Sequence, residues 1–477
     1  MKVRVLTAIA GLTLLVSGCA IGPRYQRSAV AVGKQWTAPE TRGIVAGEPA
    51  AEWWTTFKDP QLASLVKRAV DGNFDLQLAT ARVNEARAAR GVARSGLFPS
   101  LGAGVSATHN RQRAVAAPAS LGGPVRTTQV ELDNFEGHFD ATWELDVFGR
   151  IRSGLRAASA DTVATEEARR DVFVTLLGEV GRIYTELRGL QLRLAIAEKN
   201  IHTQQDTVEV TQARSKAGLA TDLDVERAMA QLETTRSAVP TLQSGILAAI
   251  HRLSLLIGQN PGSLSAELTA SAPVPVTPPE VPIGLPSDLL ERRPDVRRSE
   301  GEIVAATARV GEAKAAYFPR FVLSGTAGRQ ASELHDITLG VGNFFSAGPA
   351  ISVPIFTGGR IRSNIRIQDA RLQQTVIRYR SAVLSALEET ENALVSYSNE
   401  QSRRERLESA VRANEEAVKL SNERYRAGLT DFLSVLDAQR ELYANEDLLA
   451  QSRTAQTVDL IALYKALGGG WQSVPQP

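Results

Sequence analysis

The sequence contains a single cysteine, Cys19, among its 477 residues. One thiol cannot form a disulfide within the chain, and it cannot supply a cysteine-rich metal site. The five histidines are scattered and form no His-x-x-x-His or Cys-His pairing, so no metal site is expected. Nucleophile-elbow, phosphate-loop and dinucleotide motifs are missing as well. We therefore expect no catalytic residues, no metal and no enzymatic activity.

The sequence also lacks a marked excess of charge of either sign, and it lacks long apolar runs. The chain has 54 basic and 52 acidic residues, and a formal net charge of +2 gives nothing to attract nucleic acid. After residue 19 no apolar run is long enough for a membrane-spanning helix, because the nearest approach, 246–257, contains His251 and Arg252. Aromatic residues make up only 5%, while small and helix-favouring residues dominate the long segments. This composition is typical of extended helices.

The N-terminus has the pattern of a secretory signal. A basic start is followed by a short apolar run over 5–16 and by small residues directly before Cys19. Leu15-Val16-Ser17-Gly18-Cys19 resembles a bacterial lipobox, in which the cysteine becomes the new N-terminus and carries lipid. The residue directly after the cysteine is Ala20 rather than an aspartate. In this it resembles lipoproteins that are sent to the outer membrane. We expect a signal peptide over 1–18 and a covalent lipid on Cys19, with no other cofactor.

The second half of the chain repeats the first at a nearly constant offset. Gly149-Arg150-Ile151-Arg152-Ser153 returns 210 residues later as Gly359-Arg360-Ile361-Arg362-Ser363. Lys216-Ala217-Gly218-Leu219 returns as Arg426-Ala427-Gly428-Leu429, and the following Thr221-Asp222 is matched with Thr430-Asp431. Such a period is too long for a solenoid. It indicates a duplicated domain, each copy consisting of a helix, two strands and two long helices.

Alternating apolar and polar residues predict two strands in each copy. We expect them at about 98–108 and 132–147 in the first copy, and at about 318–328 and 345–356 in the second. Their lengths suit strands that cross a bilayer, which need about 9–11 residues. The intervening segments, about 109–130 and 329–342, are polar or rich in glycine and proline, and we expect exposed loops there.

Long helices follow the strands. The runs at about 150–217 and 360–427 contain no proline, and a continuous helix over either would be about 100 Å long. Each ends in an Ala-Gly-Leu turn and is followed by a return helix, at about 221–258 and 431–467. The expected organisation is a signal peptide (1–18), a lipidated extended segment (19–60), a first repeat (61–260, helices 150–258), a linker (261–286), a second repeat (287–470, helices 360–467) and a tail (471–477).

Four strands per chain cannot close a barrel, since single-chain barrels need at least about eight. Open sheet edges cannot lie in a bilayer, where every backbone polar group must be hydrogen-bonded. The chain is therefore expected to oligomerise, and three copies would supply twelve strands. The residues by themselves predict an α+β membrane protein that forms an outer-membrane, helix-barrel trimer.

Three motifs carry a resemblance to a known family. They are Gly22-Pro23 with Tyr25-Gln26-Arg27, the stretch Leu285 to Val296 (LPSDLLERRPDV), and Arg424 to Asp431 continued by Val435 to Arg440. They resemble the TolC-like outer membrane factors, specifically the NodT-type efflux lipoproteins, over essentially the whole chain. The resemblance implies a trimeric, 12-stranded transmembrane β-barrel, with four strands per chain, continued by a long periplasmic α-helical barrel. This fold would be the passive exit duct of a tripartite efflux system. The resemblance also implies a homotrimer in the outer membrane, lipid-anchored and extending into the periplasm, that docks on a periplasmic adaptor and an inner-membrane pump of the RND type.

The resemblance also implies a gate at the periplasmic tip. The matching residues are Tyr425, Arg426, Asp431 and Asp437, together with Lys216, Asp222 and Asp224 in the first copy. The turns that would meet the adaptor are Ala217, Gly218, Leu219 and Ala427, Gly428, Leu429. Gly218 and Gly428 are expected to supply left-handed turn conformations. For Asp431 and Asp222 a plain helix-capping role remains open.

Two other functions remain open from the residues alone. The chain could be a structural helical lipoprotein tethered to the outer membrane, or a secreted enzyme on a helical fold. The alternating strands argue against a scaffold, which has no use for a lipid-facing stripe. The lack of a convergent catalytic set argues against an enzyme.

Overall fold

The computed structural model describes residues 21–27, 30–37, 42–116, 126–337 and 342–473. The expected signal peptide and Cys19 lie outside the described residues. The chain folds into two compact units, each assembled from separate stretches of sequence. The first unit contains residues 84–163 and 300–377 with the start of the chain, and the second contains 29–83, 164–299 and 378–477.

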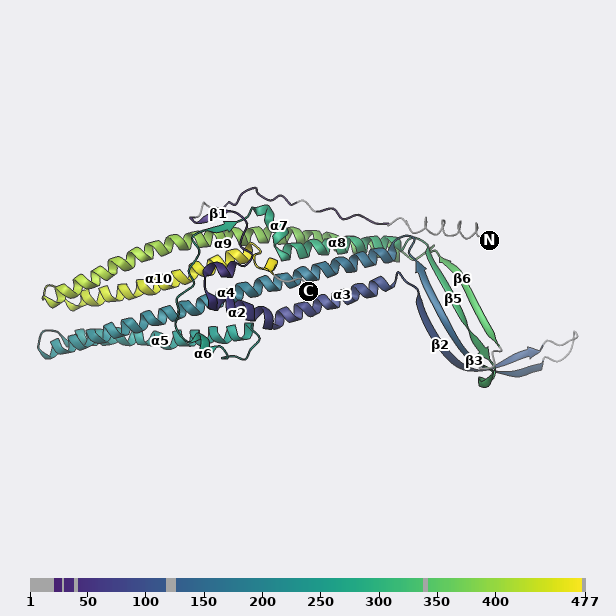
Figure 1. The fold of residues 1–477 in the computed structure, drawn as a ribbon, viewed down its shortest axis with the longest axis horizontal. Coiled ribbons are helices and arrows are strands. Elements are labelled where there is room, and N and C mark those ends of the chain that lie inside the picture. The colour runs from purple at the N-terminus through teal and green to yellow at the C-terminus, as the bar shows by residue number, and fades with distance from the viewer. Residues whose placement is uncertain (1–20, 28–29, 38–41, 117–125, 338–341, 474–477) are drawn as a thin grey trace. The chain divides into compact units, whose positions relative to one another are not determined.

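A four-stranded antiparallel sheet dominates the first unit (Figure 1). Its strands lie in the order β2-β3-β5-β6, so the two strands of each copy are neighbours. Their bounds are Ser100–Ala116 for β2, Arg126–Leu145 for β3, Arg320–Ala331 for β5 and Asn343–Ser352 for β6. Ala141 in β3 lies opposite both Leu101 in β2 and Gly325 in β5, which fixes the register across the first three strands.

The first strand pair is longer than the alternation predicts. The ladder between β2 and β3 continues through most of 109–130, so the prediction of a loop over that whole segment is wrong. Polar side chains there pair across the strands, with His109 Nδ1 lying 2.7 Å from Asp133 and Arg111 pairing with Glu131. Backbone hydrogen bonds carry the ladder, and cross-strand ion pairs support it without an apolar face.

The last strand is shorter than predicted at its end. β6 stops at Ser352, which pairs with Arg320 at the start of β5. Residues 353–356 have no partner, because Pro319 precedes Arg320 and offers no N–H to extend the ladder. β3 likewise ends at Leu145 rather than at 147, opposite Phe321.

The two copies have helices of matching length. The long helices are α4 (Arg150–Lys216) and α9 (Arg360–Arg426), each of 67 residues, and the return helices are α5 (Asp222–Leu256) and α10 (Phe432–Ala466), each of 35. The helices that lead into the strands are α3 (Phe74–Ser95) and α8 (Pro294–Ala315), each of 22. Among the described residues, no helix is both long and apolar enough to cross a membrane.

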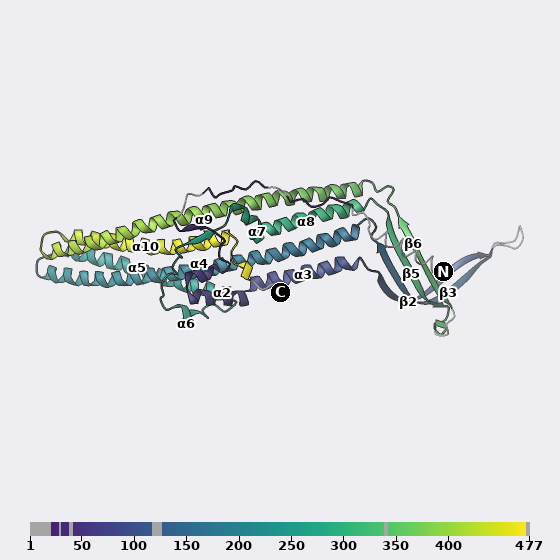
Figure 2. The same ribbon diagram turned by 45° about the horizontal axis from the view of Figure 1, so that its top comes forward.

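Each long helix folds back into a hairpin through a tight turn (Figure 2). Gly218 and Gly428 have φ of 74° and 75°, which confirms the predicted left-handed conformation. The N–H of Leu219 donates to the carbonyl of Arg214 at 2.8 Å, and the second hairpin repeats the bond from Leu429 at 2.9 Å. These bonds close the helix ends as in a Schellman motif, which requires the φ > 0 residue.

The second unit packs the N-terminal segment onto helices of both copies. Trp53, in the 3₁₀ helix η1 (Trp53–Phe57), is 1% exposed and stacks on Tyr464 of α10 at 5.6 Å. Asp59 caps the N-terminus of α2 (Pro60–Gly72) and also accepts a 2.8 Å hydrogen bond from the hydroxyl of Tyr184 in α4. One short segment therefore ties α4 of the first copy to α10 of the second.

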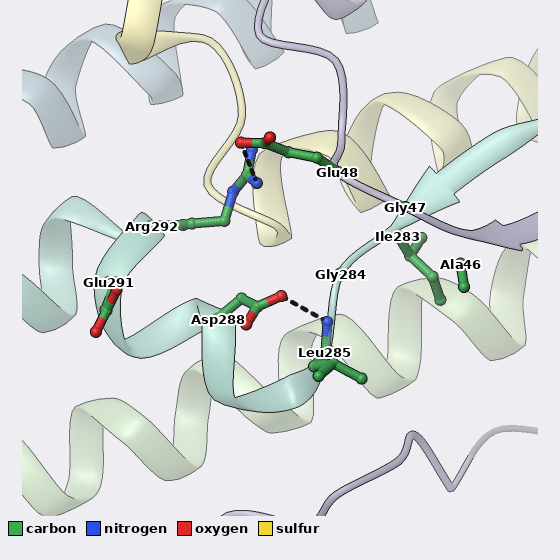
Figure 3. A pocket seen from close by; sticks show the side chains of 9 residues that line it. All are labelled: Ala46, Gly47, Glu48, Ile283, Gly284, Leu285, Asp288, Glu291 and Arg292. Carbon is green, nitrogen blue, oxygen red and sulfur yellow. Dashed lines mark hydrogen bonds and ion pairs between the residues drawn. The ribbon is translucent and has the colours of Figure 1, made fainter.

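The same segment pairs with the linker between the copies (Figure 3). β1 (Ile44–Ala46) lies parallel to β4 (Val281–Ile283), and the short elements α6 (Ser265–Leu268), η2 (Pro286–Asp288) and α7 (Leu289–Arg292) belong to this linker region. Beyond β4, Asp288 accepts a 2.8 Å hydrogen bond from the N–H of Leu285. Arg292 lies 3.1 Å from Glu48. The start of the LPSDLL motif is thus a structural junction.

Candidate functional site

One face of the sheet is apolar across all four strands. In a single row, Phe139 of β3 lies between Ala103 of β2 and Ala327 of β5, and Ala327 in turn faces Phe345 of β6. The largest side chains of this face are exposed in the single chain: Leu101 76%, Val105 90%, Phe139 63%, Trp143 36%, Leu323 43%, Phe345 82% and Ile351 62%. A wide apolar face of this kind marks a surface that meets lipid or protein.

The opposite face of the same sheet is mainly polar or small, with Val322 and Phe344 as apolar exceptions. Asp140 lies between Gly102 and Thr326, and Thr326 faces Ser346. Because side chains alternate along a strand, the two chemistries separate onto two faces of one layer. An apolar face and a polar face on strands of this length suit a sheet with lipid on one side and water on the other.

In the second unit, an apolar cluster joins the two hairpins near their turns. We call it the tip cluster. Its buried members are Val208, Ala228, Leu232 and Phe432, and Ile201, Tyr425 and Leu436 pack against it. Phe432, only 3% exposed, is the first residue of α10 and contributes the largest buried ring. The cluster thus couples the helices of the first copy to those of the second.

Tyr425, a predicted gate residue, lies within this cluster. Its ring is 5.7 Å from that of Phe432, and the guanidinium of Arg214 lies 4.5 Å over its face. Its hydroxyl is buried and has no hydrogen-bond partner among the described residues. The sequence analysis did not single out Arg214 or Phe432. The sequence did contain a signal for Phe432. A strict offset of 210 residues aligns Phe432 with Asp222, so this ring occupies the position of a predicted site residue in the other copy.

The other predicted gate residues do not meet Tyr425 within one chain. Asp437 pairs with Arg440 on its own helix at 3.4 Å, and both side chains are about half exposed. Arg426 is exposed, and in the described part of the chain it forms no ion pair. Contacts of the kind expected at a gate would therefore have to form between chains, and the Tyr425 hydroxyl would have to turn out of its buried position to join them.

Asp431 caps a helix, which is the plainer of its two expected roles. Its carboxylate accepts hydrogen bonds from the N–H and hydroxyl of Ser434, at 3.1 and 2.6 Å. These bonds, the hydroxyl bond first, lower the pKa of Asp431. In the first copy the cap is Thr221, which forms a capping box with Asp224. The match of Asp222 with Asp431 is therefore off by one residue, since the two caps, 210 residues apart, are Thr221 and Asp431.

The hairpin turns present apolar side chains to solvent. Leu219 is 67% exposed and Leu429 is 69% exposed, and Leu223 and Leu433 on the following helical turns are 57% and 40% exposed. Ala217, Gly218, Ala427 and Gly428 complete the two turns. A rigid turn with exposed leucines offers an anchor for a partner's apolar pocket.

One group of three side chains in the described residues has the spacing of a metal site. It consists of Glu333, His335 and Asp336 near η3 (Leu334–Ile337). His335 lies 2.9 Å from Asp336 and 3.4 Å from Glu333, so the two carboxylates already pair with the imidazole. All three lie at the surface, where acidic groups commonly cluster without an ion.

Asp459 in α10 is an uncompensated acid in the second unit. Burial, and after it the nearby charge of Glu400, raise the pKa of its carboxyl to about 6. In the described residues no cation pairs with it. A raised pKa means that the folded state favours the protonated form, so the unfavourable contribution grows as pH rises toward 6 and is complete above it.

Asp459→Asn should therefore stabilise the protein at pH 8 but hardly at pH 4. The gain at pH 8 should be about 1–3 kcal/mol, given roughly 1.4 kcal/mol per pKa unit. Thermal unfolding followed by circular dichroism at the two pH values measures this. An equal gain at both values would show that burial of the charge is not the cause.

Comparisons with known proteins agree with this arrangement of sheet and hairpins. The sequence profile of the family described as "Outer membrane efflux protein" matches residues 65–259 and 285–469. The solvent efflux pump outer membrane protein SrpC of Pseudomonas putida is 32% identical over 96% of this chain and 97% of its own. The outer membrane protein OprJ of Pseudomonas aeruginosa is 31% identical over 96% and 95%.

Solved structures give the same result. The outer-membrane channel OprN superposes with a TM-score of 0.89 at 36% identity, covering 95% of this chain and 100% of its own. The open-state MtrE channel of Neisseria gonorrhoeae gives 0.80 at 26% identity, covering 95% and 99%. The chain is located in the outer membrane and extends into the periplasm, and it is not an enzyme. The profile match over both repeats, these relatives and the shared fold show that the chain belongs to the outer membrane efflux protein family.

Proposed function

We propose that this protein is the exit duct of a tripartite efflux system, a passive channel across the periplasm and the outer membrane. The observation that carries the proposal is the sheet with one continuous apolar face and one polar face, on a chain that also forms two 67-residue helices. Such a sheet suits a lipid boundary, and long paired helices suit a conduit. Partners supply the energy, because the chain offers no catalytic set.

The channel would be a homotrimer. β2 and β6 are the edge strands of the described sheet, and each has one side without a partner. An unpaired edge in hydrocarbon costs several kcal/mol per polar group. Pairing β2 of one copy with β6 of the next removes both edges, and three copies close a twelve-stranded barrel, a number within the known range.

The hairpin turns would dock a periplasmic adaptor, which connects the duct to an inner-membrane pump of the RND type. The exposed Leu219 and Leu429 and their rigid glycine turns support this assignment. A lipid on Cys19 would anchor the N-terminus to the outer membrane. The rival function, a tethered helical scaffold, would leave the apolar sheet face without a purpose.

Conductance of the purified protein in planar lipid bilayers tests the channel function. The resting channel should conduct weakly, and Tyr425→Phe combined with Asp437→Ala should raise its single-channel conductance and sensitise cells to large antibiotics. The two substitutions remove polar groups from every subunit of the trimer. This weakens the contacts that hold the hairpin ends of the helices together. Each exposed contact contributes about 1 kcal/mol or less, so opening needs several changes together.

Glu415→Ala is the matched control, because Glu415 is an exposed acid on α9 for which no ion pair is observed in the described residues. It should change neither conductance nor antibiotic sensitivity. An unchanged conductance in the double variant, with normal assembly, would place the constriction elsewhere. A protein without any conductance would contradict the channel itself.

A further inference from the structure

A mostly apolar cavity of about 380 Å³ lies in the first unit, where α8 ends, β5 begins and α9 starts. Its apolar lining is Ile21, Tyr317, Phe318 and Ile365. Phe318 is fixed by the ring of Phe148, 4.8 Å away. The cavity therefore lies directly beside the root of the apolar sheet, on the side of the helices.

Three cations surround this apolar cavity. They are Lys314 on α8 and Arg362 and Arg366 on α9, and the described residues provide no ion pair for any of them. The first turn of α9 contains no acidic residue, so the positive end of the helix dipole also lacks a counter-charge. An apolar floor with unneutralised cations at its rim matches the chemistry of an amphiphile with an anionic head.

The duplication shows what a neutralised version of this junction looks like. In the first copy, Arg150 donates to Glu144 at 2.8 and 2.9 Å. Asp146 receives the N–H groups of Ile151 and Arg152 at 3.0 and 2.8 Å, so it caps the start of α4. The cavity beside that junction is lined by Glu144 and Glu312 as well as by Arg150.

The second copy has lost both of these carboxylates. In the 210-residue register, Glu144 and Asp146 are replaced by Pro354 and Phe356, while the arginines are kept as Arg360 and Arg362. The anion that the chain supplies at the first junction is therefore absent from the second. The kept arginines are exposed and lack a carboxylate from the described chain, so they are free to bind an anion from outside it.

The N-terminal segment forms one wall of the cavity through a close backbone crossing. Gly22 has φ of 143°, and a Cβ there would lie 2.5 Å from the Cα of Gly311 in α8. Tyr25 then donates to Glu300 at 2.6 Å, which fixes the segment along α8. Ile21 is thereby held against the cavity, two residues after the cysteine expected to carry lipid.

We propose that this cavity binds an anionic glycerophospholipid of the outer membrane, with its phosphate between Arg362, Arg366 and Lys314 and the start of an acyl chain on Tyr317 and Ile365. The lipid attached to Cys19 is not the chosen occupant, because a diacylglyceryl group has no negative charge. A phosphate accepts charge-assisted hydrogen bonds from guanidinium groups in fixed geometry. The bound lipid would seal the second junction as Asp146 and Glu144 seal the first.

Native mass spectrometry of the purified full-length protein in detergent tests this. With equal added amounts, phosphatidylglycerol should remain bound and phosphatidylcholine of the same acyl composition should be retained far less. Arg362→Gln with Arg366→Gln should reduce bound phosphatidylglycerol about tenfold or more, since two charge-assisted bonds are lost. Lys314→Gln alone should reduce bound phosphatidylglycerol severalfold. This single variant provides the test if the double variant folds poorly.

Arg371→Gln with Arg378→Gln is the matched control, since it removes the same charge from exposed positions of α9. It should leave lipid binding unchanged. Equal losses in both double variants, or displacement of the lipid by millimolar inorganic phosphate, would overturn the proposal. Binding that appears only in a Cys19→Ser background would also overturn it, because the chain's own lipid would then be the occupant. If the Arg362 and Arg366 double variant lost its assembly but still bound phosphatidylglycerol, the cations would contact a second copy of the chain instead of a lipid. That result would also overturn the proposal.

Discussion

Arg293→Ala is expected to lower the free energy of unfolding by about 3–5 kcal/mol, the usual cost of leaving buried partners without their counter-charge. Arg293 is 8% exposed. Its guanidinium binds Asp295 at 2.8 and 3.0 Å, Glu389 of α9 at 2.7 Å and the carbonyl of Ala466 at 3.0 Å. It thus joins α8, α9 and the end of α10 within the second unit.

The charges in this network reinforce one another. Burial by itself would lower the pKa of Arg293, but the hydrogen bonds and charges of Asp295 and Glu389 raise it. Burial would likewise raise the pKa of Asp295, but Arg293 lowers it below its ordinary value. Asp295 therefore contributes stability at neutral pH that is lost only as pH falls through its lowered pKa. Without Arg293 the same burial would act against the carboxylate of Asp295.

Chemical denaturation in detergent, followed by circular dichroism, measures the loss for Arg293→Ala. Arg403→Ala is the control, because Arg403 is 47% exposed and pairs with Glu400 within one helix at 3.2 Å. That substitution should change stability by about 1 kcal/mol or less. If the two variants lost equal stability, the buried network would not be the cause.

Phe139→Arg should strongly impair insertion into the outer membrane. Phe139 lies on the apolar face in the row formed with Ala103 and Ala327, and it is 63% exposed in the single chain. An arginine on a lipid face costs about 2–4 kcal/mol near the middle of the bilayer. The amount of protein in the outer-membrane fraction, and its folding into lipid vesicles, should both fall.

Thr142→Arg is the matched control for that substitution. It introduces the same side chain three residues along β3 but on the opposite, polar face, where Thr142 lies opposite Ser100 and Ser324. Water on that side would solvate the new charge, so insertion should be close to normal. Equal insertion of both variants would mean that the apolar face does not meet lipid.

The long helices with their ends, and the interiors of the strands, could be predicted from the sequence, but the ends of the strands could not. The alternation through Phe139, Ala141 and Trp143 defines a strand because side chains on a pleat alternate. The extension of β2 to Ala116 shows no alternation of apolar and polar residues in the sequence. Backbone hydrogen bonds and cross-strand ion pairs can hold polar residues in a ladder without it. The end of β6 depends on where its neighbour starts, which no local pattern contains.

The candidate site divides in the same way. The glycine turns at 218 and 428 follow from the local need for positive φ. The contact of Tyr425 with Arg214 joins residues more than 200 positions apart, so neither residue marks it locally. The caps were misaligned by one residue, because Thr221 and Asp431 serve the same position with different side chains.

By itself, the sequence determined the duplication, the long helices, the left-handed turns and the membership in a class of outer-membrane ducts. These follow from periodicity, from the absence of proline in the long runs and from repeated motifs, all of which act over a few neighbouring residues. Only the tertiary structure decided that one face of the sheet is apolar across four strands, that Arg293 joins three helices, and that Arg152 pairs with Asp146. Those facts depend on register and on packing between distant segments, where the energy of a charge or an aromatic ring is set by its surroundings.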